Sequence, residues 1–151
     1  MIKQKLFLKG KLKAILEHAN GEKEIFAKDN LIVDGGVDFI ADAIGKAAGR
    51  PDVMSHIAVG ESDTVVGGVQ TALLDEIERK AATYAHVAGE TSFTFSATFN
   101  AGEGTGAIAE AGVLNADENG ILLDRVVFDL PIPKGADDVL TLIFTFTISQ
   151  D

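Results

Sequence analysis

The sequence predicts a mainly β fold, an antiparallel β-sandwich of jelly-roll-like type with one or two short helices. Residues 91–100 and 139–149 alternate between apolar and hydroxyl side chains, with Phe, Leu and Ile on one side and mostly Thr and Ser on the other. Asn-Gly pairs at residues 20–21 and 119–120 favour tight hairpin turns, because both central residues of such turns need positive φ. Glycine is frequent at 16 residues and proline rare at 3, as expected of short strands joined by Gly-rich turns.

The strands follow from these patterns in order. Residues 12–18 and 22–28 flank the first Asn-Gly pair and are expected to form a hairpin. Residues 121–130 form a third apolar stretch, and we expect Pro131 and Pro133 to end it, because proline cannot donate to a ladder. Strands with one apolar side bury that side and expose the other to water, which indicates two sheets packed face to face.

Two segments have helical spacing. The first is expected to begin after Asp34 as its cap and to end near Gly45. Its packing side would carry Val37, Ile40, Ala41 and Ile44. The second covers residues 71–80, where acidic residues precede basic ones, as the helix dipole favours. Its packing side would carry Leu73, Leu74 and Ile77, and residues 61–70 before it are expected to form a loop.

Length and composition predict one folded domain over residues 1–151. Apolar residues make up 46% of the chain and charged residues 24%, a balance typical of globular proteins and too apolar for a disordered chain. The absence of cysteine excludes a thiol nucleophile, a disulfide framework and a thiolate metal cage. The longest apolar runs fall far short of the roughly 20 residues that cross a bilayer, so we expect a protein made and kept in solution.

The charges are divided unevenly along the chain. The net charge is −10, yet residues 1–13 hold five lysines and no acid: Lys3, Lys5, Lys9, Lys11 and Lys13. The remaining acidic body would repel phosphates, which argues against nucleic-acid binding. We interpret residues 1–13 as a basic N-terminal arm. It either docks on an acidic partner or serves as a lysine-rich strand edge that discourages aggregation.

Sequence patterns of metal, cofactor and catalytic sites are incomplete. Residues 115–120 resemble the opening of a calcium-binding EF-hand loop, but Val126 stands where the bidentate glutamate belongs. Residues 102–107 loosely match a dinucleotide-binding glycine pattern, but no helix is expected to follow. The histidines are isolated, at His18, His56 and His86. We therefore predict no catalytic residue, cofactor, metal or small-molecule substrate.

Several separate segments resemble motifs of small structural proteins of tailed bacteriophages. In chain order they are residues 30–36 (Asn-Leu-Ile-Val-Asp-Gly-Gly), residues 57–60 (Ile-Ala-Val-Gly), Thr71-Ala72-Leu73 with Glu76 and Arg79, residues 108–114 (Ile-Ala-Glu-Ala-Gly-Val-Leu), and a strand carrying Arg125. The likeness spans roughly residues 20–150. One departure is the acidic opening of the loop at residues 61–63. Of these residues, Glu110 is expected to bond loop amides, and Glu76 with Arg79 to form an i, i+3 ion pair.

The resemblance implies a non-enzymatic virion component synthesised in the host bacterial cytoplasm. We favour a capsid decoration (cement) protein, a homotrimer bound to the major capsid protein on the outer surface of the capsid. A tail-fibre or baseplate accessory protein and a carbohydrate-binding β-sandwich module remain alternatives, the last weakened by the single tyrosine and absent tryptophan. The expected partner-binding residues are the five lysines of the arm together with Glu61, Asp63, Val65 and Val66.

Overall fold

The computed structural model describes residues 3–150, which fold into ten strands and one helix. The strands are β1 (Leu6–Glu17), β2 (Lys23–Asp29), β3 (Leu31–Ile32), β4 (His56–Gly60), β5 (Glu76–Ala81), β6 (Thr83–His86), β7 (Ser92–Phe99), β8 (Gly106–Leu114), β9 (Leu122–Lys134) and β10 (Val139–Gln150). The helix, α1, covers Asp34–Gly45. Within the described residues it is the only helix, and it is neither long nor apolar enough to cross a membrane.

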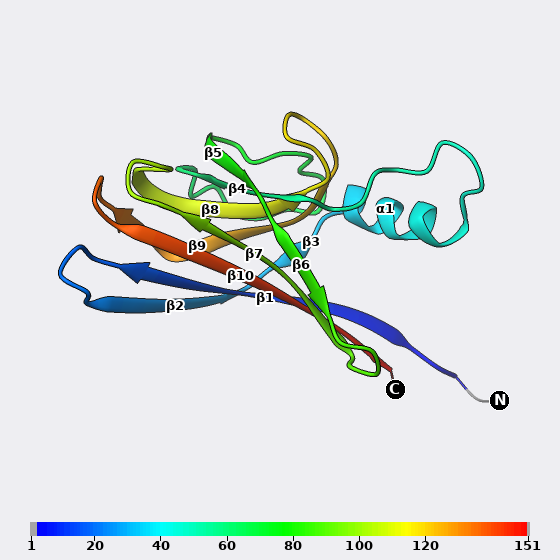
Figure 1. Ribbon diagram of the computed structural model, residues 1–151. Coiled ribbons are helices and arrows are strands. Elements are labelled where there is room, and N and C mark those ends of the chain that lie inside the picture. Colours follow the sequence, from blue (N-terminus) through cyan, green and yellow to red (C-terminus); the bar gives the residue numbers. More distant parts are fainter. Residues whose placement is uncertain (1–2, 151) are drawn as a thin grey trace.

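Two five-stranded antiparallel sheets pack face to face, which confirms the predicted sandwich (Figure 1). Sheet A has the order β2-β1-β10-β7-β6, and sheet B has the order β3-β9-β8-β4-β5. The chain changes sheet four times, after β2, β5, β7 and β9. The first and last strands pair in the middle of sheet A, from Leu6 opposite Gln150 to Glu17 opposite Val139. The first strand and the last strand of the described residues therefore lie side by side.

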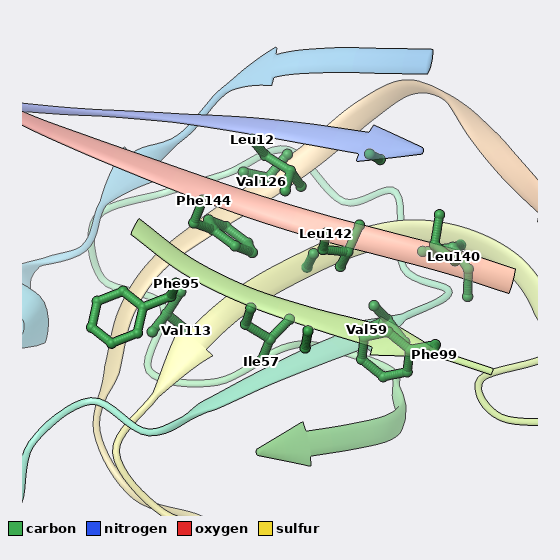
Figure 2. Packing of buried hydrophobic residues seen from close by; sticks show 14 of the residues in the cluster. Leu12, Ile57, Val59, Phe95, Phe99, Val113, Val126, Leu140, Leu142 and Phe144 are labelled. Atoms are coloured by element: carbon green, nitrogen blue, oxygen red, sulfur yellow. The ribbon is translucent and has the colours of Figure 1, made fainter. Parts of the chain in front are cut away.

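The core lies between the sheets, and Figure 2 shows its side chains pointing toward one another from both sides. β10 contributes Leu140, Leu142, Phe144 and Phe146, all fully buried. The residues between them, such as Thr141 and Thr145, face outward and are half-buried. The alternation predicted for residues 91–100 and 139–149 is therefore confirmed, and most of the phenylalanines fill this layer.

Both predicted Asn-Gly hairpins form, but only one has positive φ at both residues. Between β8 and β9, Asn119 has a φ of 53° and Gly120 a φ of 77°. Between β1 and β2, only Gly21 has positive φ, at 88°, and the amide of Gly21 donates to the carbonyl of His18 at 2.9 Å. The first hairpin thus uses its glycine alone for the left-handed position.

The helix predicted over residues 71–80 is wrong. Residues 71–75 are irregular, and β5 pairs with β4 from Gly60 opposite Glu76 to His56 opposite Ala81. A helix of this length is marginal in isolation, so pairing along a sheet edge outweighs its propensity. A register shift after Val59 bulges β5. The bulge brings Glu76 and Arg79 together as a bidentate ion pair at 2.7 and 2.8 Å, so the expected pair forms on a strand.

The prediction that Pro131 and Pro133 end a strand is also wrong, because β9 continues through them to Lys134. Pro133 lies opposite Ala107 of β8. On its other side β9 pairs with β3 only at Asp124 and Arg125, so the proline half has an open edge. A proline whose nitrogen faces an open edge removes no ladder hydrogen bond.

The helix α1 ends at Gly45 as predicted, but it begins one residue early, so Asp34 is not its cap, and its packing side differs. Asp34 lies in the first turn, and Val33 precedes the helix without a side-chain capping bond. At Gly36, β9 approaches α1 so closely that a Cβ there would collide with the backbone carbonyl of Leu123. This close approach buries Gly36. Ile40 packs toward the core, whereas Val37, Ala41 and Ile44 are exposed. In Figure 1, α1 stands out from one end of the sandwich.

Candidate binding surfaces

Residues 61–75, between β4 and β5, lie over the outer face of sheet B, and we call them the covering loop. Leu73 is 7% exposed and packs in a small second core with Val33, Ala58, Leu114 and Leu122. Ala58 alternates with the inward-facing Ile57 and Val59, so it points away from the main core. The outer face of sheet B is therefore a second buried layer.

A fully buried ion pair fastens the covering loop. Arg125 Nη2 lies 2.7 Å from Glu110 Oε2, and neither side chain has exposed surface. Arg125 Nη1 donates to the carbonyl of Thr64 at 2.7 Å and to Gln70 Oε1 at 3.1 Å. Glu110 Oε1 accepts from the amide of Asp75 at 3.2 Å, which confirms the expectation that Glu110 bonds loop amides. The pair thus reaches the loop at both its beginning and its end.

The glycine before the loop makes this fastening possible. A Cβ on Gly60 would overlap the carbonyl oxygen of Asp75 and lie 2.7 Å from Glu110 Oε1. Arg79 extends the fastening to the turn between β8 and β9, because its Nη1 donates to the carbonyls of Ala116 and Asn119, both at 2.9 Å. Residues from the separate segments that carry the family resemblance therefore meet around the covering loop.

The covering loop presents two exposed valines. Val65 is 80% exposed and Val69 84% exposed, although the loop beneath them is bonded to buried groups. Of the other expected loop residues, Asp63 is exposed and Val66 is half-buried. Glu61 is exposed, and its Oε2 accepts weakly from the amide of Ala107 at 3.4 Å. Apolar side chains held out on a fixed loop are a candidate contact surface.

The structure places most of the expected basic arm inside sheet A. Residues 3–5 precede β1, whereas Lys9, Lys11 and Lys13 lie within β1 and point outward on alternate residues. We call these three residues the lysine column. They line a shallow groove of about 660 Å³ on the outer face of sheet A, together with small residues of β2 and β10: Ala27, Thr145 and Thr147. Within residues 3–150, none of the three lysines forms a salt bridge with a carboxylate.

The two sets of expected binding residues lie on opposite faces of the sandwich. The lysine column is on the outer face of sheet A, and the covering loop is on the outer face of sheet B. The structure therefore separates them into two surfaces. Sequence patterns predict the outward direction of each residue but not which sheet carries it.

One further surface, which the sequence patterns above do not predict, lies at the end of sheet A that extends past sheet B (Figure 1). A groove of about 780 Å³ lies there between Leu6, Tyr84, Phe93 and Ile148, with His86, Glu90 and Gln150 among its polar lining. Tyr84 is 57% exposed, and its ring centroid lies 6.1 Å from that of Phe93. The inward alternation of β1 and β10 continues to Leu6 and Ile148, and that continuation is the signal that could have predicted it.

A buried acid joins the two sheets from inside. The amide of Val113 donates to Asp124 Oδ1 at 3.1 Å, and Asn30 Nδ2 donates to Asp124 Oδ2. The backbone amide of Asn30 also donates to the carbonyl of Gly10 in β1, at 3.1 Å. Burial raises the pKa of Asp124 to about 7, and the two hydrogen bonds oppose that rise only in part. Asn30 Oδ1 is buried and has no partner among the described residues.

The remaining sequence motifs serve local structure. Residues 115–121 connect β8 to β9, and Asn115 Oδ1 accepts from the amide of Ile121 at 2.6 Å. Residues 102–107 lead into β8, so no helix N-terminus follows the glycine pattern. Among residues 3–150, no group of three or more His, Asp or Glu side chains is placed to hold a metal ion.

The fold and its surfaces define the class of this molecule as a two-sheet antiparallel β-sandwich with a fastened surface loop. Comparison of the chain with protein-family models, curated proteins and solved structures gives no match. The resemblance to structural proteins of tailed phages therefore stays a prediction.

Proposed function

We propose that this protein is a non-enzymatic structural component of a tailed-phage virion, and specifically a homotrimeric decoration (cement) protein on the outer surface of the capsid. A cement protein must contact more than one neighbour at once. A sandwich with the lysine column on one face and the exposed valines on the opposite face suits that task. The same two surfaces would also suit a tail-fibre or baseplate accessory protein.

The observation that carries the proposal is the fastening of the covering loop by Arg125 and Glu110. A fully buried ion pair is costly, because two charges are removed from water. Here the ion pair holds a loop whose tip exposes Val65 and Val69 to solvent. A preorganised apolar tip loses little conformational entropy when it binds, which favours a role in stable assembly.

The copy number of this chain in purified particles tests the proposal and separates its two versions. A shell protein follows the symmetry of the head and is expected on the order of hundreds of copies, whereas tail components follow the low-order symmetry of the tail. Quantitative mass spectrometry against the major capsid protein gives the ratio. Hundreds of copies support decoration, and a few to tens support the tail version. Absence of the chain from particles overturns both.

Aspartate at the two loop valines is expected to impair particle binding without unfolding the protein. The double variant Val65→Asp/Val69→Asp should change the free energy of unfolding by no more than about 1 kcal/mol, because both side chains are exposed. Its occupancy on particles that lack the wild-type chain should fall strongly, as measured by co-sedimentation. The matched control is Val53→Asp, since Val53 is also exposed, at 77%, and lies outside the covering loop. Equal occupancy of the double variant and the wild type would remove the loop from the interface.

A carbohydrate-binding module is the second candidate, and the groove at the projecting end of sheet A favours it. Tyr84 offers an exposed ring, and His86, Glu90 and Gln150 offer hydrogen-bonding groups beside it. Sugar rings stack on such aromatic faces. Binding to host glycans that is lost in Tyr84→Ala would support this candidate, and glycan arrays without signal would remove it.

A further inference from the structure

The lysine column is an exposed basic line whose lysines form no ion pair within residues 3–150. Lys9, Lys11 and Lys13 are exposed, lie on one side of one strand and repeat every second residue. Together they make this face locally positive, which attracts an acidic surface at low ionic strength. Beside the column, Ile25 and Ala27 of β2 are exposed on the same face, Ile25 at 63%. The groove therefore combines a basic line with an adjacent apolar line, and its one acid is Asp29 of β2, directly opposite Lys11.

The helix α1 carries the complementary pair of lines. Asp34, Asp38 and Asp42 repeat every fourth residue and share one side of the helix. Val37, Ala41 and Ile44 follow the neighbouring side, where Val37 is 57% and Ile44 82% exposed. Asp34 and Asp38 are exposed, whereas Asp42 is half-buried and lies 3.7 Å from Lys46. Within residues 3–150 this apolar side stays exposed, while the opposite side of α1 packs against β9 at the end of the sandwich (Figure 1).

The two surfaces also match in length. Three lysines on alternate strand residues span about 14 Å at the strand rise. Three aspartates on every fourth helical residue span about 12 Å at the helical rise. The small residues of the groove, Ala27, Thr145 and Thr147, leave room for a helix to lie close to the sheet.

We propose that α1 of one copy of this chain docks in the lysine groove of a second copy. The aspartates face the lysine column, and Val37, Ala41 and Ile44 cover Ile25 and Ala27. Such a contact is heterologous, because it joins two different surfaces, and repetition closes it into a ring when the rotation allows. The contact rests on the proposed homo-oligomer and specifies which surfaces of two copies meet. Its test uses purified protein and not particles.

Charge reversal and its compensation test the contact. In sedimentation equilibrium at low salt, the wild type is expected to self-associate, and Lys11→Glu/Lys13→Glu to weaken the association by about tenfold or more. Adding Asp38→Lys/Asp42→Lys to that variant inverts the charge on both surfaces and is expected to restore association to near the wild-type value. Raising the salt concentration should weaken wild-type association, since the pairs are screened.

Two controls keep the outcomes distinct. Lys3→Glu/Lys5→Glu changes the net charge by the same amount outside the groove and should leave association unchanged. Circular dichroism and thermal unfolding of every variant establish that each is folded. A chain that stays monomeric at low salt overturns the proposal, and so does association that ignores the reversals or is not restored by the charge swap. Each of these three failures leaves the particle copy number, and with it the proposed function, as a separate question.

Discussion

Replacing Glu110 with alanine is expected to lower the free energy of unfolding by about 3–5 kcal/mol, because the change leaves a buried guanidinium without its charge partner. Both side chains are fully buried, and Arg125 Nη2 lies 2.7 Å from Glu110 Oε2. The remaining acceptors of Arg125, the carbonyls of Thr64 and Ser62 and Gln70 Oε1, are uncharged and do not balance its charge. The amide of Asp75 would also lose its acceptor. Urea unfolding of the two proteins measures the difference.

The matched control is Asp129→Ala, which breaks an exposed ion pair. Asp129 pairs with Lys28, and the Asp129 side chain is 84% exposed. Exposed pairs contribute between zero and about 1 kcal/mol. If Glu110→Ala lowers the free energy of unfolding by no more than Asp129→Ala does, the role given to the buried pair is contradicted.

An apolar replacement of the whole pair separates stability from loop fastening. Glu110→Leu/Arg125→Met removes both charges and should recover much of the stability lost in Glu110→Ala. It also removes the donor to Thr64 and Gln70, so the covering loop loses its hold. Limited proteolysis should then cut residues 61–70 faster than in the wild type.

Replacing Asp124 with asparagine is expected to stabilise the protein at pH 8 and to leave its stability at pH 4 nearly unchanged. The pKa of Asp124 is about 7 in the folded protein, against an ordinary value of 3.8. The folded state therefore holds the proton more tightly than the unfolded state, and wild-type stability falls as the pH rises from about 4 to about 7. The gap between the two pKa values corresponds to on the order of 4 kcal/mol. Above pH 7 the loss is complete.

Asparagine fits the site because it keeps the shape and removes the charge. Its amide oxygen can accept from the amide of Val113, as Asp124 Oδ1 does at 3.1 Å. Its NH2 group replaces Asp124 Oδ2, so the Asn30 amide must turn over to present as acceptor its Oδ1, which has no partner in the wild type. Urea unfolding at both pH values measures the effect. Asp124→Ala is the control, because it removes the acceptor of the Val113 amide at either pH. If Asp124→Asn and the wild type differ in free energy of unfolding by the same amount at pH 4 and pH 8, Asp124 does not carry a buried charge at pH 8.

Local patterns predicted the parts of the fold that local physics determines. Residues 92–99 and 139–150 alternate because each faces a core on one side only, and α1 ends where predicted, although it begins at Asp34 and not after it. The segment 71–80 was misjudged because its charges and leucines satisfy a helix as well as a bulged edge strand. Only the long-range pairing with β4, and the contact of the Asp75 amide with Glu110, decides between them. Pro131 and Pro133 were misjudged for the same reason, since an open edge is a property of the neighbouring strand.

The candidate surfaces were predicted in part. The exposure of Val65, Glu61 and Asp63 follows from their place in a loop. The lysines were correctly expected to face water, but an arm was inferred where β1 pairs on both sides from Lys11 onward. The side of α1 predicted to pack is largely exposed, because the close approach at Gly36 places the opposite side of the helix against β9. No single-chain pattern specifies which side of a helix a distant strand approaches.

The pairing of β1 with β10 has a consequence for how this protein is made. The strand that completes the middle of sheet A leaves the ribosome after all the others. Until then the apolar side of β1 has only β2 beside it, and nascent chains expose unpaired strand edges that favour aggregation. Closure of sheet A must therefore wait for the synthesis of β10, and a polypeptide cut short before residue 139 would lack the strand that joins both halves of the sheet.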